Sequence, residues 1–455
     1  MSSLSVVILA AGKGTRMRSA LPKVMHPIAK KPMLHHVIET SQQLNAEKIC
    51  VVYGHGGDIV QQQSSHLDVC WVEQAEQLGT GHAVQQALPL LSDDSTVLIL
   101  YGDVPLTSVD TLQQLAAMSD RYKAVLLTME MANPQGYGRI VRNDGGDVLR
   151  IVEQKDASME ELAITEVNTG IMAVNGAQLH AQLAKLNANN AQGEYYLTDL
   201  VELCVADSIA VGALSVSDVN EVAGVNNRLQ LATLERHYQQ LQAEKLMLAG
   251  ATLADPSRID IRGDMQVGED CMIDVNCIFE GRIVLGKNVV IDSNCCLIDC
   301  EVADGTHILA NSHLQGATIG NDCTIGPFAR VRPGTQLANK AKLGNFVETK
   351  NANIGQGSKV NHLSYVGDSQ VGDNVNIGAG TITCNYDGAN KHKTIIKDNV
   401  FVGSDTQLVA PVTLHEGVTI AAGSTITKDV EADVLALTRI KQKHVSGWKR
   451  PEKKK

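Results

Sequence analysis

Two different hydrophobic patterns divide this chain of 455 residues. In the first half, short apolar runs such as Val6–Leu9 and Ile49–Tyr53 alternate with longer stretches such as Pro32–Leu44 and Val109–Met118, whose apolar residues recur at helical spacing. The short runs predict buried strands, and the longer stretches predict helices. This alternation extends to about residue 225 and indicates an α/β domain with a mainly parallel sheet, in which ligands bind beyond the carboxyl ends of the strands.

A single amphipathic helix is predicted over residues 227 to about 249. Leu234, Tyr238 and Leu248 fall on one face of this helix, and Gly250 can end it. We expect the helix to join the two halves of the chain.

From Val267 onward the hydrophobic period is six. Apolar residues occupy every sixth position from Val267 to Ile291, from Ile319 to Leu343 and from Ile396 to Ile426. Neither a helix nor a plain strand has this period, which is the hexapeptide pattern of a parallel β-helix. Each hexad would form one flat face and a corner, three hexads would complete a coil, and the apolar residue would fill the interior.

A polar segment, residues 383–393, interrupts this repeat. It contains Asn385, Tyr386, Lys391 and His392, and it cannot continue the hexads. We expect a loop that leaves the rigid β-helix, which is a suitable place for binding groups.

Composition narrows the classes of function. A net charge of −11 argues against broad contact with nucleic acid, and the strongly basic stretch Lys449–Lys455 is interpreted as a solvated tail. No apolar run is long enough to cross a membrane, and Val6–Ala11 is too short for a secretion signal. We therefore expect neither nucleic acid nor a membrane among the partners. Because aromatic residues make up only 3% of the chain, the core must consist of aliphatic and small side chains.

The ten cysteines are scattered and form no CxxC pair. Cys271, Cys277, Cys295 and Cys323 each follow a repeat residue by four positions, which predicts small packing residues rather than metal ligands or disulfides. Reduced thiols of this kind indicate a cytoplasmic location.

A Gly-rich loop follows the first predicted strand. Gly12 and Gly14 allow backbone N–H groups to approach a polyphosphate, and Arg16 and Lys23 can stabilise charge as a P–O bond breaks. The loop is neither a Walker loop nor a dinucleotide fingerprint, because Met17 stands where the fingerprint needs its third glycine.

The strand, the Gly-x-Gly-Thr-Arg-Met loop and the following Pro-Lys resemble the sugar nucleotidyltransferases, and the hexads resemble the hexapeptide-repeat acyltransferases. Together, over essentially the whole chain, they resemble the bacterial family of bifunctional N-acetylglucosamine-1-phosphate uridyltransferases/glucosamine-1-phosphate N-acetyltransferases. The most specific segments are Leu9–Lys23, Gln74–Ala83, Tyr101–Pro105, Gly136–Ile140, Gly224–Arg228 and Gly378–Lys391.

The resemblance implies a definite architecture. We expect a Rossmann-like α/β nucleotidyltransferase domain over residues 1–226, a linker helix over 227–250, an all-β left-handed parallel β-helix acetyltransferase domain over 251–438, and a basic C-terminal tail over 439–455. The left hand is opposite to the usual right-handed crossover. Acyltransferases of this kind work as trimers with sites between the β-helices, so a homotrimer is expected.

For the first half, the resemblance implies a uridyltransferase that uses UTP and Mg²⁺. The phosphate of N-acetylglucosamine 1-phosphate would attack the α-phosphorus of UTP and release pyrophosphate, with Arg16 and Lys23 as catalytic residues and with Asp103 and Asn226 as metal ligands. Taken alone, Asp103 would be interpreted as a turn residue and Asn226 as a helix N-cap. The implied UDP-sugar site comprises Leu9, Ala10, Ala11, Gly12, Lys23, Gln74, Gly79, Thr80, Tyr101, Gly102, Asp103, Gly138, Glu153, Asn168 and Asn226. Within that site, the uracil contacts would be Gln74, Gly79 and Thr80, and the sugar contacts would be Gly138, Glu153 and Asn168.

For the second half, the resemblance implies transfer of acetyl from acetyl-CoA to the amine of glucosamine 1-phosphate. The amine must be neutral to attack a thioester, so a histidine base is useful, and His362 matches the family's base. The implied sugar-phosphate contacts are Arg332, Lys350, Tyr365 and Asn376. The implied acetyl-CoA contacts are Ala379, Asn385, Tyr386, Ser404, Ala422 and Arg439, with Ser404 as a donor to the thioester oxyanion and the tail from Arg439 closing over CoA. The product would feed the synthesis of peptidoglycan and lipopolysaccharide.

Three alternatives remain from the sequence. The chain could be a monofunctional sugar nucleotidyltransferase with a scaffolding β-helix, a two-domain transferase with another sugar or nucleotide, or a nucleotide-sugar sensor. His362, Lys350 and the interrupted repeat argue against a pure scaffold. Arg16 and Lys23 argue against a sensor, which does not need to stabilise a transition state.

Overall fold

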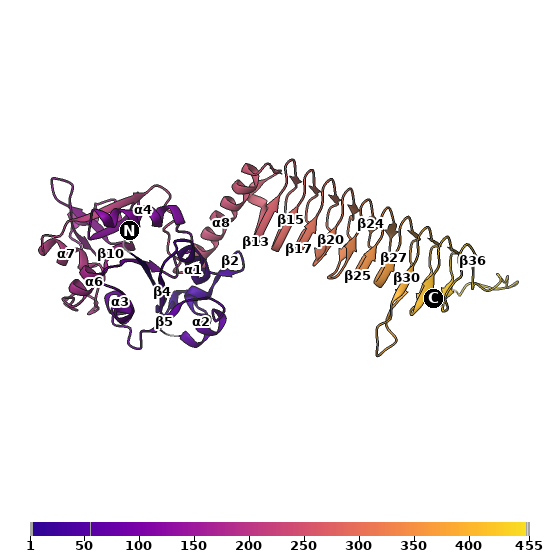
Figure 1. Ribbon diagram of the computed structural model, residues 1–455, viewed down its shortest axis with the longest axis horizontal. Helices are drawn as coiled ribbons and strands as arrows, with labels where there is room; N and C mark the ends of the chain where they lie inside the picture. Colours follow the sequence, from indigo (N-terminus) through magenta and orange to yellow (C-terminus); the bar gives the residue numbers. More distant parts are fainter. Residues whose placement is uncertain (1–2, 55, 452, 454–455) are drawn as a thin grey trace. The chain divides into compact units, whose positions relative to one another are not determined.

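The computed structural model describes residues 3–54, 56–451 and 453, so Met1 and Ser2 of the predicted first domain and Glu452, Lys454 and Lys455 of the predicted tail lie outside it. The chain divides into two compact units, Met1–Tyr238 and Gln239–Lys455 (Figure 1). Each unit is described by itself. None of the described helices is long and apolar enough to cross a membrane.

A mainly parallel sheet forms the centre of the first unit. In the described residues it has nine strands, with the path β11-β7-β10-β6-β1-β4-β5; β8 pairs with β10, and β9 pairs with β8. Only β10 and the β8–β9 pair run antiparallel to their neighbours. The strands are β1 (Leu4–Leu9), β4 (Lys48–Tyr53), β5 (Cys70–Glu73), β6 (Thr96–Tyr101), β7 (Ala124–Glu130), β8 (Arg139–Arg142), β9 (Val148–Val152), β10 (Glu166–Asn175) and β11 (Val211–Val216). The short strands β2 (Pro27–Ile28) and β3 (Lys31–Pro32) pair separately.

Helices cover this sheet, and two predicted ones are confirmed. The predicted helix Pro32–Leu44 is α1, with Pro32 at its N-cap, and the predicted helix Val109–Met118 is α4, whose N-cap Ser108 accepts a hydrogen bond from Thr111 N. The helices are α1 (Met33–Gln43), α2 (Gly57–Gln63), α3 (Thr80–Ala87), α4 (Val109–Ala117), α5 (Met159–Leu162), α6 (Gly176–Leu183) and α7 (Asp199–Ala206). The 3₁₀ helices are η1 (Thr15–Met17), η2 (Lys23–Met25), η3 (Leu88–Leu90) and η4 (Met118–Asp120), and η5 (Pro256–Arg258) lies in the second unit.

The central strand β1 shows why its sequence is apolar throughout. Val7 and Leu9 pack in one hydrophobic core, and Val6 and Ile8 pack in another. Successive side chains of a strand point to opposite faces, so both faces of β1 are buried. The carboxyl ends of β1 and its parallel neighbour β6 then lie together, and both run into loops that the sequence singled out.

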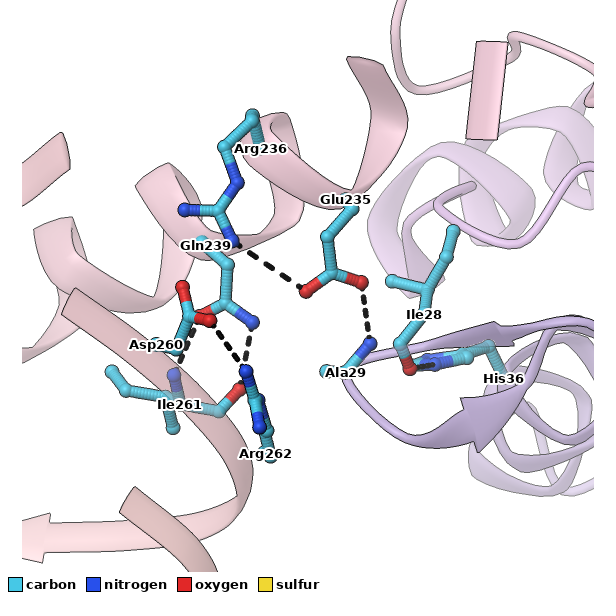
Figure 2. A network of polar contacts seen from close by, with 9 residues as sticks. All are labelled: Ile28, Ala29, His36, Glu235, Arg236, Gln239, Asp260, Ile261 and Arg262. Carbon is cyan, nitrogen blue, oxygen red and sulfur yellow. Dashed lines mark hydrogen bonds and ion pairs between the residues drawn. The ribbon is translucent and has the colours of Figure 1, made fainter. Parts of the chain in front are cut away.

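Helix α8 (Arg228–Leu248) spans the border of the two units, within the segment predicted to join them. In the first unit, Leu234 packs with Met17, and Glu235 accepts a hydrogen bond of 2.7 Å from Ala29 N (Figure 2). In the second unit, the Gln239 amide exchanges hydrogen bonds of 2.6 and 2.9 Å with the backbone of Ile261. Each half of the helix is therefore anchored in its own unit.

The second unit is a parallel β-helix, as the hexads predict. Its described strands form one sheet of eleven and one of fourteen, and all the pairs are parallel. Long strands of the larger sheet turn a corner, because β17 pairs with β19 through its first residues and with β20 through its last. The unit therefore has three faces, consistent with the predicted left-handed β-helix of hexapeptide repeats.

The sheet of eleven consists of β12 (Thr252–Leu253), β14 (Met272–Ile273), β16 (Val290–Ile291), β18 (His307–Ile308), β21 (Thr324–Ile325), β24 (Lys342–Asn345), β26 (Lys359–His362), β28 (Asn376–Ile377), β31 (Phe401–Val402), β34 (Thr419–Ile420) and β36 (Leu435–Ala436). The sheet of fourteen consists of β13 (Ile259–Val267), β15 (Cys277–Leu285), β17 (Cys296–Val302), β19 (His313–Gln315), β20 (Thr318–Ile319), β22 (Arg330–Val331), β23 (Gln336–Leu337), β25 (Glu348–Ile354), β27 (Tyr365–Val371), β29 (Ile382–Cys384), β30 (Thr394–Ile396), β32 (Gln407–Val409), β33 (Val412–Leu414) and β35 (Thr425–Ile426).

Aliphatic ladders fill the interior of the β-helix. Leu343 pairs with Val360, Val360 with Ile377, and Ile377 with Val402, and each of these side chains is at most 2% exposed. The four cysteines of the repeated slot are also buried and free, which confirms their predicted packing role: Cys271, Cys277, Cys295 and Cys323.

The interrupted repeat is visible as a loop that leaves the β-helix between β29 and β30 (Figure 1). Most paired residues of successive coils are 17 or 18 positions apart, whereas Asn376 pairs with Phe401, 25 positions later. Tyr386 forms an antiparallel bridge with Lys391, and Asp387 accepts hydrogen bonds from two backbone N–H groups of the loop. The loop therefore has its own ordered turn.

Candidate functional sites

The Gly-rich loop lies where the predicted phosphate site requires it. It leaves the end of β1, and Gly102 N, just after β6, donates to Leu9 O. Gly14 has a φ of 57°, and a Cβ there would lie 2.6 Å from Lys23 Cβ. Glycine is therefore needed at position 14 for both conformation and space. A Cβ on Gly12 would meet nothing within 4 Å, so that residue faces open space.

Four predicted residues from distant segments meet beside this loop. The Lys23 ammonium pairs with the Asp103 carboxylate, and Asn226 Oδ1 accepts hydrogen bonds from Arg16 Nη2 at 2.8 Å and Lys23 Nζ at 3.5 Å. The backbone joins the same segments, because Val225 N donates to Asp103 O at 3.0 Å. Two cations, one carboxylate and one amide oxygen thus form a single polar group.

This group fits a magnesium ion in its donor chemistry. Asp103 and Asn226 offer a carboxylate and an amide oxygen, which are hard ligands. Within the described residues, no set of three or more His, Cys, Asp and Glu side chains could enclose a metal. A pair of one carboxylate and one amide oxygen suits Mg²⁺, which commonly takes one or two protein ligands and completes its shell with water and substrate phosphates.

A cavity of about 420 Å³ opens beside the loop. Ten of the predicted UDP-sugar residues line it: Leu9, Ala10, Ala11, Gly12, Lys23, Gln74, Gly79, Thr80, Tyr101 and Asp103. It is also lined by residues to which the sequence assigned no role: Lys13, Val24, Gln77, Ala83 and Glu194. Gln77 donates a hydrogen bond of 2.5 Å to Ala11 O and so ties the phosphate loop to the opposite wall.

The predicted uracil contacts are held rigidly. Gln74 is 4% exposed, and its amide Nε2 donates to Gly79 O at 3.0 Å and contacts His82 Nδ1 at 3.1 Å. Gly79 has a φ of 117°, and a Cβ there would lie 2.6 Å from Tyr195 O, so no larger residue fits. Thr80 Oγ1 accepts a hydrogen bond from Leu197 N at 3.1 Å.

The predicted sugar contacts form a neighbouring group. Asn168 N donates to Gly138 O at 2.9 Å, and a Cβ on Gly138 would lie 3.5 Å from Glu153 Oε1. Burial raises the pKa of Glu153, although the hydroxyl of Thr198 donates to its carboxylate at 3.2 Å. Burial also raises the pKa of Tyr101, and the charges of Asp103 and Glu153 add to this effect. Gly138, Glu153 and Asn168 do not line the 420 Å³ cavity.

In the second unit, three cations gather near one face of the β-helix. Arg332 and Lys350 occupy successive coils, and Arg332 Nη1 pairs with Glu348 Oε1 at 2.8 Å. The neighbouring Lys391, on the inserted loop, lowers the pKa of Lys350, and Arg332 lowers it further. A phosphate dianion would relieve this repulsion. The sequence assigned Lys391 no role, because only the fold of the loop brings it beside Lys350.

Tyr365 and Asn385, two other predicted contacts, also meet. Asn385 Nδ2 lies 3.4 Å from Tyr365 OH, and Asn385 is only 8% exposed. Tyr386, the next residue, is 60% exposed on the loop. The loop therefore presents one buried and one exposed predicted contact.

His362 and Asn376 lie in the other sheet. His362 ends β26 at a corner of the β-helix, and its side chain is exposed. Asn376 is in β28, where it pairs with Lys359 and Phe401. In the part of the chain that the structure describes, no hydrogen bond joins the side chain of either residue to Arg332 or Lys350. His362 and Tyr365 thus lie on either side of one corner of the β-helix.

Four predicted acetyl-CoA contacts follow one corner of successive coils. Asp405 N donates to Ala379 O at 2.7 Å, and Gly423 N donates to Ser404 O at 2.8 Å. A Cβ on Gly423 would lie 3.9 Å from Arg439 Cδ. Ala379, Ser404, Ala422 and Arg439 therefore form a continuous line beside the corner.

Comparison with known proteins shows which protein families the two units match. Residues 6–167 match the MobA-like NTP transferase domain, residues 261–345 match the GMPPB C-terminal domain, and residues 393–428 match the bacterial transferase hexapeptide repeat. The chain is 59% identical over 453 residues to the "Bifunctional protein GlmU" of Marinobacter nauticus, with all of both chains covered. A solved UDP-glucose pyrophosphorylase in complex with UDP-glucose is 18% identical, with a TM-score of 0.44, over 52% of this chain and 98% of its own.

The predicted fold class and enzyme class are thereby confirmed. A nucleotidyltransferase domain and a hexapeptide acyltransferase domain occur in one chain, and a bifunctional relative matches both over the full length. The alternative of a scaffolding β-helix does not agree with this match. The chain therefore belongs to the GlmU family of bifunctional transferases of UDP-N-acetylglucosamine synthesis.

Proposed function

We propose that the second unit acetylates glucosamine 1-phosphate with acetyl-CoA and that the first unit then uridylylates the product with UTP. The observation behind this proposal is a separate group of cationic side chains in each unit. Arg16 and Lys23 form one group, and Arg332, Lys350 and Lys391 form the other. Each reaction has a sugar phosphate as substrate, so each needs such a group.

In the uridylyl transfer, positioning and charge neutralisation are the main tasks of the protein. The phosphate oxygen of N-acetylglucosamine 1-phosphate forms a bond to the α-phosphorus of UTP, and the bond to the pyrophosphate oxygen breaks. Arg16 and Lys23 stabilise the charge on the phosphates, and backbone N–H groups around Gly12 approach the same oxygens. Asp103 and Asn226 would hold Mg²⁺, which neutralises phosphate charge when bound.

In the acetyl transfer, the amine nitrogen attacks the thioester carbonyl and the C–S bond breaks. His362 takes the proton that the amine loses and returns it to the departing CoA sulfur, so that CoA leaves as a thiol. The hydroxyl of Ser404 donates to the oxyanion that forms on the carbonyl oxygen. Arg332, Lys350 and Lys391 hold the phosphate of the sugar.

We also propose a homotrimer, because the second unit consists of hexapeptide repeats of the kind found in trimeric acyltransferases. His362 and Asn376 belong to the sheet of eleven, whereas Tyr365 and the strand that carries Lys350 belong to the sheet of fourteen. These strands meet at the corner beside His362, and a second copy placed there would add its own side chains to the site. Light scattering should give three times the mass of one chain, and the mass of a monomer would contradict this part of the proposal.

A cytoplasmic location is part of the same proposal. The two proposed co-substrates, UTP and acetyl-CoA, are metabolites of the cytoplasm, so the enzyme that uses them would be found there. The ten cysteines are all free in the structure, which is the state expected where thiols stay reduced.

The first experiment is to measure thiol release from acetyl-CoA in the presence of glucosamine 1-phosphate and without UTP. Release that depends on the sugar phosphate would support the acetyl transfer directly. No release, while pyrophosphate still forms from UTP and N-acetylglucosamine 1-phosphate, would refute the assignment of the β-helix and leave only the uridylyl transfer.

A further inference from the structure

A buried carboxylate lies under the root of the inserted loop. Asp368 is in β27, is 8% exposed and has a φ of 47°. It is not among the residues that the sequence assigned to either reaction. Burying a carboxylate is costly unless hydrogen bonds compensate it, so its partners are informative.

Two asparagine amides meet this carboxylate, one on each oxygen. Asn351 Nδ2 donates to Asp368 Oδ1 at 2.7 Å, and Asn385 Nδ2 donates to Asp368 Oδ2 at 2.5 Å. Asn351 belongs to the preceding coil, and Asn385 begins the inserted loop. Asp368 therefore joins the rigid β-helix to the first residue of the loop.

The chemistry of the carboxylate decides how the Asn385 amide is turned. An ionised carboxylate can only accept hydrogen bonds, so it must be met by Nδ2 and not by Oδ1. In the described residues, Asn385 Oδ1 has no hydrogen-bond donor, whereas Asn385 Nδ2 contacts both Asp368 and Tyr365 OH. The amide oxygen is thus left as an acceptor.

We infer that Asp368 is a positioning residue for acetyl transfer, which fixes the Asn385 amide so that its oxygen accepts an N–H group of a bound substrate. The inference rests on the proposed acetyl transfer, for which Asn385 is a predicted acetyl-CoA contact. Two substrates carry suitable N–H groups, namely the amine of glucosamine 1-phosphate and the amides of the CoA arm. The KM values distinguish these two sources.

The test is Asp368→Asn in the full chain. The new amide brings its own N–H, so it cannot accept from both Asn351 and Asn385, and the Asn385 amide loses its fixed orientation. We expect kcat/KM for acetyl transfer to fall about 10- to 100-fold, since hydrogen bonds to charged groups are worth that much. A rise in the KM of acetyl-CoA would indicate the CoA arm, and a rise in the KM of glucosamine 1-phosphate would indicate the amine.

A matched control and a rescue variant separate positioning from folding. Asp373→Asn makes the same change at a carboxylate that accepts from Gln356 N and has no bond to the loop, so acetyl transfer should be unchanged. The double variant Asp368→Asn with Asn385→Asp exchanges the two groups. It restores an amide-to-carboxylate hydrogen bond and leaves a carboxylate oxygen as the outward acceptor, so it should recover part of the lost kcat/KM.

The outcomes are distinct because both reactions occur in one chain. Reduced acetyl transfer with unchanged uridylyl transfer, an unchanged melting temperature and recovery in the double variant would support the inference. Unchanged acetyl transfer in Asp368→Asn would overturn it, and so would a loss that follows the melting temperature and is not recovered. A wild-type chain without acetyl transfer would overturn the proposed function and this inference with it.

Discussion

The two candidate sites differ in how their cations are compensated. In the first unit, Lys23 pairs with Asp103 and Arg16 bonds to Asn226, so the cations are met by oxygen atoms of the protein. In the second unit, Lys350 and Lys391 stand side by side, and their repulsion lowers the pKa of Lys350. Each cation of the first site contacts an oxygen atom of the protein, whereas in the second site Arg332 pairs with Glu348 and Lys350 faces another cation.

This difference follows from the chemistry proposed for each site. A nucleoside triphosphate arrives with a divalent cation, so its site needs oxygen ligands for the metal as well as cations for the phosphates. A sugar phosphate that arrives alone brings only negative charge, so cations without oxygen ligands suffice. The proposed sites therefore differ mainly in Asp103 and Asn226, the oxygen ligands that a metal would use at the first site.

Metal removal should separate the two sites most strongly. With excess EDTA, we expect uridylyl transfer to fall about 1,000-fold or more, because a metal supplies several kcal/mol of charge stabilisation. Acetyl transfer should be unaffected, since the proposed mechanism of that reaction uses no metal. Pyrophosphate and thiol release measure the two reactions, and added Mg²⁺ should restore the first. Full uridylyl transfer in EDTA would contradict the proposal that the first site uses a metal.

Removal of the proposed base should have the second largest effect, and it should impair acetyl transfer and not uridylyl transfer. His362→Ala should lower kcat for acetyl transfer about 100- to 10,000-fold, because a general base is worth that much, and should leave uridylyl transfer intact. His313→Ala is the matched control, since His313 is also an exposed histidine on a strand of the β-helix. Equal loss of both activities in His362→Ala would mean a structural effect and not a base.

The close approach of the two lysines can be tested at Lys391. Lys391→Met should raise the KM of glucosamine 1-phosphate about tenfold, which corresponds to one charge-assisted hydrogen bond, and should leave the KM of acetyl-CoA unchanged. The pKa of Lys350 should rise at the same time, because its repulsive neighbour is gone. Lys393→Met, in the same loop, is the control. A similar KM in both variants would show that the loop contributes no specific phosphate contact.

The sequence predicted the repeating parts of both units well, for a physical reason. A coil must place an apolar residue inside at every sixth position, so the ladder through Leu343, Val360 and Ile377 is visible as a period. The strand β1 is buried on both faces and therefore forms a continuous apolar run. Both features depend on residues at fixed, short spacing, and such spacing can be recognised in a single sequence.

The convergence of distant residues could not be predicted from spacing. Arg16 and Asn226 are 210 positions apart, and only the packing of the loop around Met17 against Val225 and Leu234 brings them together. Asn226 by itself resembled a helix cap, and only the family resemblance indicated a ligand.

The residues Asp368 and Lys391 were missed for another reason. Asp368 occupies a corner with positive φ that Asp299 and Asn351 also occupy, so it resembled an ordinary turn residue. Lys391 had no period to place it, since it lies outside the hexads. The signal that could have found Lys391 was its place in the interruption of the repeat, and for Asp368 it was the spacing of 17 positions, one coil, before Asn385.

The smallest expected effect concerns the pH dependence of stability, which should differ between the two units. Asp199, the first residue of α7, lines a second cavity of about 380 Å³ with Glu153, Asp156 and Glu202. Burial raises its pKa to about 6, and the charges of its neighbours add to this. In the unfolded chain the pKa is about 3.9. The folded state therefore holds a proton that the unfolded state has lost between about pH 4 and pH 6, and stability falls as the pH rises through this window.

Asp199→Asn should remove this penalty. At pH 7.5 we expect the free energy of unfolding of the first unit to rise by about 1–2 kcal/mol. This is less than the full pKa shift corresponds to, because the Asp199 side chain is partly exposed to solvent. At pH 4 we expect no change. Asp207, at the other end of α7, is the matched control with the opposite sign, because hydrogen bonds from Gln182 and Lys185 lower its pKa. Asp207→Asn should therefore destabilise the first unit at pH 7.5. Calorimetric transitions at both pH values measure each effect, and the transition of the β-helix should respond to neither substitution. A shift of the β-helix transition in Asp199→Asn would mean that the two units do not unfold independently. The units would then differ in the chemistry of their sites but not in the pH dependence of their stability.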